Sequence, residues 1–209
     1  MIDLLWGDTE GLFYFQRNPN AERMLKAYEK DRIVSTAGHA SSSKSETLAM
    51  LSVLLFLIYG KDIKVLVTAQ TLASAEGKIW GKIRVAWQQA CRFFGGEQNT
   101  VGKMMAGGMI RYQDAEGHSA LAGIELVATN AGNAKDSVEK IQGYKGNTGL
   151  IFMAGDEWAT LPIALWETVK KNLLANRRFR LCACFNPDSF YDAGGQISEP
   201  ANGWDSITQ

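Results

Sequence analysis

Short apolar runs alternate with longer helical stretches along the chain. Short runs that are mostly apolar or β-branched predict strands, at residues 33–36, 63–69, 150–153 and 179–185. Longer amphipathic or apolar stretches between them predict helices, at residues 21–30, 48–59, 72–94 and 162–175, the first capped by Asn20. Strands that alternate with helices favour a parallel sheet with right-handed crossovers. We therefore expect an α/β fold with a mainly parallel central sheet flanked by helices.

Residues 97–130 have a different character, because glycines punctuate alternating runs such as Ile110-Arg111-Tyr112. This pattern is typical of short antiparallel strands, so we expect a small antiparallel hairpin insertion there. Residues 191–209 are polar and are expected to be a tail or the start of a linker. One domain over residues 1–190 is the resulting prediction.

Composition narrows the class of protein. The 209 residues are 46% hydrophobic and 21% charged, which is ordinary for a globular chain with a real core and excludes disorder, collagen and coiled coil. The 22 basic and 22 acidic residues balance, so a wholly basic nucleic-acid coat is excluded and any such contact must be local. The longest apolar run, residues 48–59, is too short to span a bilayer, so no membrane contact is expected. Three cysteines without a CxxC pair and two distant histidines argue against a zinc site, and the cysteines fit a reduced cytoplasm.

A loop of small residues lies between the first predicted strand and the apolar helix. Such a loop, closed by Lys-Ser at a helix start, is typical of P-loop NTPases, in which backbone N–H groups and the helix dipole hold phosphate. The loop departs from GxxxxGK[ST] at Ser43, where glycine would reach a positive φ more easily. A serine-rich capped loop is the alternative interpretation. The candidate nucleotide-binding residues are Gly38, His39, Ala40, Ser41, Ser42, Ser43, Lys44 and Ser45.

A pair of carboxylates, Asp156-Glu157, follows the apolar strand at 150–153. In P-loop enzymes the first such acid holds the Mg²⁺ shell and the second polarises the attacking water. An exposed Asp-Glu turn is the alternative. The order of the two motifs, with another strand between them, favours a nucleotide hydrolase.

With these two motifs, the sequence resembles the large terminase subunit of tailed bacteriophages, the motor that packages viral DNA. The resemblance covers roughly residues 12–190. It also rests on four further stretches, at residues 15–16, 65–80, 141–146 and 166–187, the last ending in Asn186-Pro187.

The resemblance implies ATP and Mg²⁺ as ligands and a role for each motif residue. Lys44 would bind phosphate and act in catalysis with Glu157, while Ser45 and Asp156 would hold Mg²⁺. Asn186 would sense the γ-phosphate, and Gln16, in an N-terminal adenine-side segment at residues 1–32, would contact adenine. A turn-forming role for Asn186 and a solvated one for Gln16 are the alternatives.

The sequence also departs from the family pattern. Many members have an arginine inside the loop, where this chain has His39 and Ala40, so the arginine that stabilises transition-state charge is not identified. Unranked candidates for this cation are Arg84, Arg92, Arg111, Arg177, Arg178 and Lys145. Members usually carry a C-terminal nuclease domain, and nothing after residue 190 could form one, so we expect no nuclease activity from these residues.

The implied function is ATP hydrolysis that translocates double-stranded DNA into a procapsid. The implied partners are this DNA, the small terminase subunit, the portal protein and further copies in a ring, in the host cytoplasm with transient docking on the procapsid. A helicase-like P-loop ATPase and a truncated, non-hydrolysing assembly module are the alternatives. One stretch concentrates positive charge and predicts either phosphate contact or a solvated helix end, at Lys170, Lys171, Arg177, Arg178 and Arg180.

Overall fold

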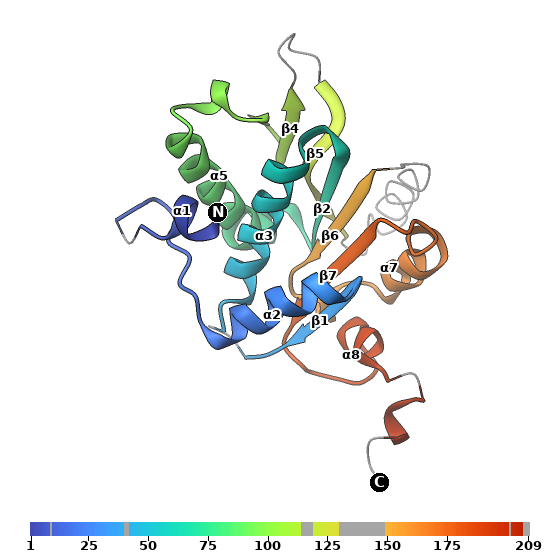
Figure 1. Ribbon diagram of the computed structural model, residues 1–209. Coiled ribbons are helices and arrows are strands. Elements are labelled where there is room, and N and C mark those ends of the chain that lie inside the picture. Colours follow the sequence, from blue (N-terminus) through green and yellow to red (C-terminus); the bar gives the residue numbers. More distant parts are fainter. Residues whose placement is uncertain (9, 40–41, 114–118, 130–148, 201, 207–209) are drawn as a thin grey trace.

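A seven-stranded sheet forms the centre of the molecule in a computed structural model, which describes residues 1–8, 10–39, 42–113, 119–129, 149–200 and 202–206 (Figure 1). Across the sheet the strands follow the order β1-β7-β6-β2-β5-β4-β3, and those from β1 to β5 in this order run parallel. The mainly parallel sheet is therefore confirmed. The strands are β1 (Ile33–Ala37), β2 (Ile63–Ala69), β3 (Gly102–Met105), β4 (Met109–Gln113), β5 (Ser119–Ala128), β6 (Leu150–Gly155) and β7 (Phe179–Phe185).

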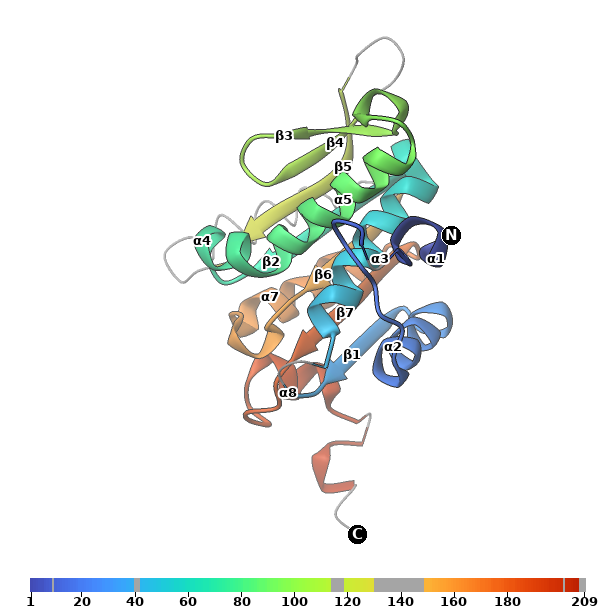
Figure 2. The same ribbon diagram turned by 90° about the vertical axis from the view of Figure 1, so that its left-hand side faces the viewer.

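Helices cover both faces of the sheet (Figures 1 and 2). One layer contains α1 (Ile2–Trp6), α2 (Pro19–Lys30), α3 (Lys44–Tyr59), α4 (Leu72–Ala75), the π-helical turn η2 (Glu76–Trp80) and α5 (Gly81–Phe93). The other contains η5 (Trp158–Thr160), α7 (Ile163–Thr168), the π-helical turn η6 (Val169–Leu173) and α8 (Ala193–Ser198). The remaining short turns are η1 (Gly60–Asp62), η3 (Glu97–Asn99) and η7 (Trp204–Ser206).

Strand β6 shows why two layers are needed. Phe152 and Ala154 belong to the apolar cluster under α3 and α5, whereas Ile151 and Met153 belong to the cluster under α7. Alternate side chains of a strand point to opposite faces, so a strand that is apolar throughout must be covered on both. Among the described residues, no helix has the length and apolar character that crossing a bilayer requires.

Helix α2 begins two residues earlier than the sequence predicts. The side chain of Asn18, not Asn20, caps it by accepting hydrogen bonds from the backbone N–H groups of Asn20 and Ala21. Pro19 occupies the first helical position, where its missing N–H costs nothing and its fixed φ suits the helix.

The antiparallel part of the sheet is confirmed, and it is continuous with the parallel part. Strands β3 and β4 form a hairpin, and β4 pairs antiparallel with β5. Strand β5 in turn runs parallel to β2, with Ile124 opposite Val65. Residues 102–113 and 119–128 therefore extend the edge of the main sheet, and residues 114–118 and 130–148 lie outside the described part.

The predicted polar tail or start of a linker over residues 191–209 contains a short helix. Helix α8 packs against the sheet, and its Ala193, Gly194 and Gly195 are buried. The Asp192 side chain caps the helix by accepting a hydrogen bond from the Gly195 N–H at 2.7 Å. Gly194 permits the close approach, because a Cβ there would lie 2.6 Å from Cδ2 of Phe185.

Candidate nucleotide-binding site

The predicted phosphate-site residues meet at the carboxyl ends of β1, β6 and β7. The loop after β1 leads into α3, Asp156 follows β6, and Asn186 follows β7. Because these strands are parallel neighbours, their carboxyl ends lie at one edge of the sheet, where ligands of open α/β sheets bind. Here a cavity of about 400 Å³, the phosphate cavity, is lined by residues that include Ser43, Lys44, Ser45, Asp156, Glu157 and Asn186.

Ser43 adopts the left-handed conformation that the loop requires. Its φ is 59° and its ψ is 17°, and helix α3 begins at the next residue. The Ser43 carbonyl accepts hydrogen bonds from the N–H of Thr47 at 2.9 Å and from its hydroxyl at 2.8 Å. The P-loop turn is thus formed without the second glycine. Ala40 and Ser41, two other predicted loop residues, lie outside the described part.

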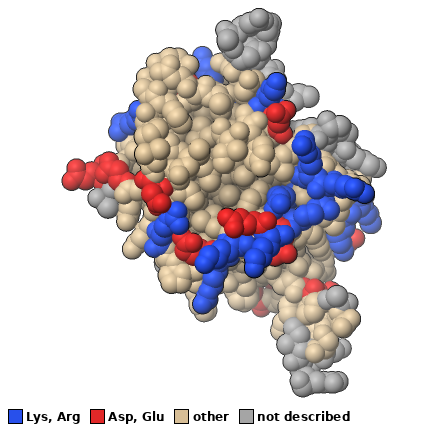
Figure 3. All heavy atoms as spheres, viewed as in Figure 1, with Lys and Arg blue, Asp and Glu red and all other residues tan. Residues whose placement is uncertain are grey.

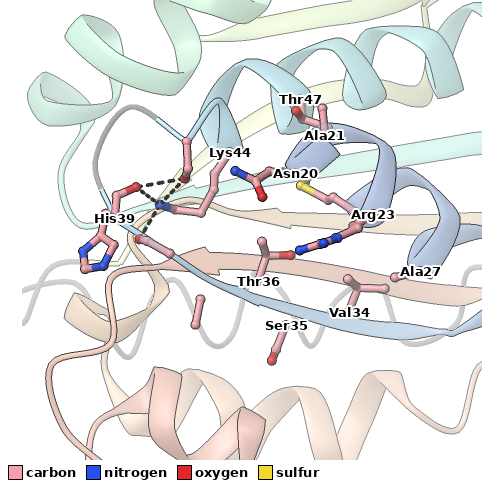
Figure 4. A pocket seen from close by; sticks show the side chains of 14 residues that line it. Asn20, Ala21, Arg23, Ala27, Val34, Ser35, Thr36, His39, Lys44 and Thr47 are labelled. Carbon is pink, nitrogen blue, oxygen red and sulfur yellow. Dashed lines mark hydrogen bonds between the residues drawn. The ribbon is translucent and has the colours of Figure 1, made fainter. Parts of the chain in front are cut away.

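The Lys44 ammonium group lies over the loop (Figure 4). It donates hydrogen bonds to the carbonyls of Gly38 at 2.6 Å and His39 at 2.7 Å, and to the Ser42 hydroxyl at 3.0 Å. Oδ1 of Asn186 lies 3.5 Å from the same nitrogen. Phosphate oxygens would replace these weak neutral acceptors with charged ones, which bind an ammonium group more strongly.

Ser45 and Asp156 form a contact between the loop and the end of β6. The Ser45 hydroxyl donates to Oδ1 of Asp156 at 2.9 Å. Burial raises the pKa of the Asp156 carboxyl, and the Ser45 hydrogen bond opposes this shift. A bound cation would favour the charged form of the same carboxylate.

The oxygen atoms of Ser45 and Asp156 suit a Mg²⁺ ion that is also bound by phosphate and water. They do not suit a metal ion that is held by protein side chains alone. Within the described residues, no group of three or more His, Cys, Asp or Glu side chains is arranged to hold a metal ion. Mg²⁺ characteristically uses one or two carboxylates together with substrate phosphates and water. A hydroxyl and a carboxylate in contact therefore match an ion that arrives with a nucleotide.

Glu157 is held beside the phosphate cavity by its backbone and by one ion pair. Its φ of 52° and ψ of 42° place it in the left-handed region, directly after Asp156. Its Oε1 lies 2.5 Å from Nζ of Lys78 on η2, and both side chains are about half exposed. Such an exposed pair contributes little to stability, so its main effect is on where the carboxylate lies.

A second cavity of about 500 Å³ adjoins the first on the side of α2 (Figure 4). The two cavities share Ser42 and Lys44. Apolar Met24, Ala27 and Val34 line the second cavity together with Asn20 and Arg23, and Arg23 reaches from α2 toward Thr36. An apolar space with a few polar groups, joined to a phosphate site, suits a nucleoside.

The structure does not support the predicted adenine contact of Gln16. This side chain is exposed and lines neither of the two cavities. The α2 residues Asn20 and Arg23 line the second cavity together with Ser42 and Lys44 of the loop. The assignment of Gln16 stays a prediction from resemblance alone.

Sequence reasoning missed several charged residues of the phosphate cavity, namely Glu46, Lys82 and Asp188. Nζ of Lys82 lies 2.5 Å from Oε1 of Glu46. One sequence signal was available, because Lys78 and Lys82 are four residues apart on a helix that begins where β2 ends. Of the described candidates for the missing cation, none lines this cavity; they are Arg84, which pairs with Glu76, and Arg92, Arg111, Arg177 and Arg178. Lys145 and the 141–146 stretch lie outside the described residues.

Comparisons with solved structures identify the fold. The ATPase domain of the large terminase of Thermus phage P74-26 aligns with 16% identity and a TM-score of 0.55, over 90% of this chain and 68% of that one. A point mutant of that domain gives 13% identity and a TM-score of 0.56, over 90% and 69%. The large terminase of a thermophilic bacteriophage gives 10% identity and a TM-score of 0.61, over 87% of this chain and 42% of that one. The sequence matches no protein-family model and no curated protein. The chain therefore has the fold of phage large-terminase ATPase domains.

Proposed function

We propose that this chain is the ATPase domain of a phage DNA-packaging motor, which uses Mg²⁺-dependent ATP hydrolysis to move double-stranded DNA into a procapsid. One observation carries the proposal: Lys44, the Ser45–Asp156 pair and Glu157 line one cavity at the sheet edge. They do so in a fold shared with large-terminase ATPase domains.

ATP would occupy the two adjoining cavities. The triphosphate lies in the phosphate cavity, where Lys44 exchanges its loop carbonyls for phosphate oxygens. The nucleoside lies in the cavity between α2 and β1. Ser45 and Asp156, which are in contact with each other, would hold Mg²⁺, and the ion would neutralise charge on the phosphates.

Glu157 would orient the attacking water and accept its proton. A general base must come within hydrogen-bond reach of the proton that it removes. Lys78 pairs with Oε1 of Glu157, and a carboxylate has a second acceptor oxygen, which would accept the hydrogen bond from the water.

Asn186 would report the state of the γ-phosphate. Its side-chain oxygen lies 3.5 Å from Nζ of Lys44, so both groups face the same part of the phosphate cavity. It follows β7 directly, and β7 contacts both β1 and β6. A change in the contacts of Asn186 therefore acts on the strands that position both phosphate motifs.

The structure bears differently on the two alternative functions, a helicase-like ATPase and a non-hydrolysing assembly module. A helicase-like ATPase would use the same residues, and a procapsid-dependent packaging assay separates it from a packaging motor. A non-hydrolysing assembly module was suggested by the loss of the loop glycine, yet Ser43 adopts the required conformation. The geometry therefore favours an active site over a decayed one.

The proposed partners are double-stranded DNA, the small terminase subunit, the portal protein and further copies of the chain in a ring. The fold supports them only through its likeness to large terminases. A cation supplied by a neighbouring copy would fit a cavity that none of the described arginine candidates lines.

Binding of a non-hydrolysable ATP analogue tests this proposal. Isothermal titration of the wild-type protein is expected to show binding that weakens when Mg²⁺ is omitted. Lys44→Ala should weaken it at least tenfold, about 1.4 kcal/mol, because the phosphates lose their cation. Lys61→Ala, which removes an exposed lysine on η1, should bind as the wild type does. Absence of wild-type binding up to about 1 mM analogue, about −4 kcal/mol, would contradict the proposal.

A further inference from the structure

A band of positive charge crosses the molecule at the amino ends of β1 and β7. The band, called the basic edge here, consists of Lys26, Lys30, Arg32, Arg177, Arg178 and Arg180. In Figure 3 blue side chains extend from the region of α2 toward that of α7, with a few red ones between them. The ATP cavities lie at the opposite, carboxyl end of the same strands.

Two arginines of the basic edge tie its halves together. Arg32 donates hydrogen bonds to the carbonyls of Leu174, Asn176 and Phe179. Arg180 donates to the carbonyl of Tyr28 and stacks 5.1 Å from the centre of its ring. Carbonyl partners hold a guanidinium group in place without neutralising it. The positive charges of Arg32 and Arg180 are therefore fixed in position and can still attract an anion.

The charges of the basic edge are not balanced locally. Glu29 and Asp31 are the acids within residues 26–32 and 176–180, against six cations. In the described part of the chain, no carboxylate lies within 4.0 Å of any of these six. The basic edge therefore keeps a net positive charge.

Two lysines that the sequence groups with this charge share one carboxylate. Lys170 and Lys171 both pair with Glu167, and Lys170 also lies over the ring of Trp166. The other three cations of the basic edge, Lys26, Lys30 and Arg32, come from α2 and the residues that follow it. Segments from both ends of the sequence thus build one surface.

We propose that the basic edge binds the phosphate backbone of duplex DNA. This rests on the proposed function, and it names the surface that would hold the DNA. Arginine guanidinium groups match phosphate oxygens in geometry and charge. Phosphate contacts carry no sequence information, which suits a motor that moves along any sequence.

The absence of exposed rings favours a duplex over a single strand. Single-strand binding surfaces combine positive charge with aromatic side chains on which bases stack. The aromatic residues within 26–32 and 176–180, Tyr28 and Phe179, are both buried. The basic edge therefore suits contact with the phosphate backbone of a DNA duplex, without stacking on its bases.

The basic edge can be altered without touching the nucleotide site. Strand β7 has seven residues, so its two ends are about 20 Å apart. Arg177 and Arg178 are exposed at its amino end, whereas Asn186 follows its carboxyl end. A loss of DNA binding in such variants can therefore be separated from a loss of nucleotide binding.

Fluorescence anisotropy with a labelled duplex of about 30 base pairs, measured over a series of salt concentrations, tests this proposal. The double variant Arg177→Gln/Arg178→Gln is expected to lower the slope of log affinity against log salt by about 2, at roughly 0.9 per phosphate contact. Affinity near 100 mM salt should fall at least tenfold. Lys26→Gln/Lys30→Gln should act in the same direction.

The matched control is Lys170→Gln/Lys171→Gln, which removes two lysines that already pair with Glu167 and should leave the slope nearly unchanged. Equal slopes for all variants, no duplex binding by the wild type, or tighter binding of a single strand would overturn the proposal. Titration of the ATP analogue into the same samples reports on the nucleotide site separately. Absence of analogue binding by the wild type would reject the proposed ATPase, while a lowered salt slope in the edge variants would still support the DNA surface.

Discussion

At the scale of single residues, Ser43 shows that the loop keeps a P-loop conformation at some cost. A non-glycine residue in the left-handed region costs roughly 1–2 kcal/mol, and Ser43 has a φ of 59°. Its side chain makes no capping hydrogen bond that would offset this cost.

We predict that Ser43→Gly raises the free energy of unfolding by up to about 1 kcal/mol, because glycine reaches this φ without steric strain. Denaturant unfolding monitored by circular dichroism measures the change. Ser43→Ala is the matched control, since it keeps the Cβ and should not stabilise the protein. Equal free energies of unfolding for the two variants would show that the left-handed conformation of Ser43 does not strain the folded protein.

Asp156 illustrates a conflict between stability and function. Burial raises the pKa of its carboxyl above the usual value. The folded state therefore binds the proton more tightly than the unfolded state, and stability falls as pH rises from the unfolded pKa through the folded one. At neutral pH the buried charge destabilises the nucleotide-free protein.

We expect Asp156→Asn to raise the melting temperature at pH 7 in the absence of nucleotide and Mg²⁺, by about 2–4 °C for each kcal/mol gained. The gain should shrink as the pH is lowered through the raised pKa of the wild-type carboxyl, because the wild-type side chain then loses its charge. Mg²⁺-dependent ATP hydrolysis should be lost in the same variant. Thermal scans across pH test this, and a lower melting temperature at pH 7 would refute it.

At the scale of elements, helix α8 depends on one close contact with the end of β7. A Cβ at Gly194 would lie 2.6 Å from Cδ2 of Phe185, whose ring is buried. At Gly77, on η2, nothing lies within 4 Å of the same added atom. The two glycines therefore form a matched pair for one substitution.

Gly194→Ala is predicted to destabilise the protein by about 1–3 kcal/mol through overpacking. Gly77→Ala should be neutral or stabilising by up to about 1 kcal/mol, because alanine favours a helix. Chemical denaturation of both variants provides the comparison. If Gly194→Ala were as stable as Gly77→Ala, α8 would not be packed against Phe185 as described.

Elements that could be predicted from the sequence are those whose pattern is local. Strands β2 and β7 are short apolar runs, and their predicted bounds agree with the structure. The place of β5 beside β2 and the packing of α8 on Phe185 depend on partners far away in the sequence. Local periodicity carries no information about those partners, so the hairpin at 97–130 and the tail were described incompletely.

At the scale of the whole molecule, the parallel sheet explains why most of the phosphate site was predictable. Lys44, Ser45, Asp156 and Asn186 all follow strands whose carboxyl ends meet. The cavity beside α2 was not predictable, because the side chains that α2 contributes reach it from a helix that covers the sheet, and Lys82 had only its helical spacing from Lys78 as a signal. The opposite edge likewise gathers charges from two distant segments.

The proposed catalytic role of Glu157 is tested most directly by the steady-state rate of ATP hydrolysis. The wild-type protein is expected to hydrolyse ATP only with Mg²⁺, and Glu157→Gln to lower the turnover number at least about 100-fold, the usual range for loss of a general base. Glu167→Gln, an exposed carboxylate on α7, should keep the wild-type rate. Binding of the ATP analogue should persist in Glu157→Gln. Equal rates for the wild type and Glu157→Gln would contradict the account.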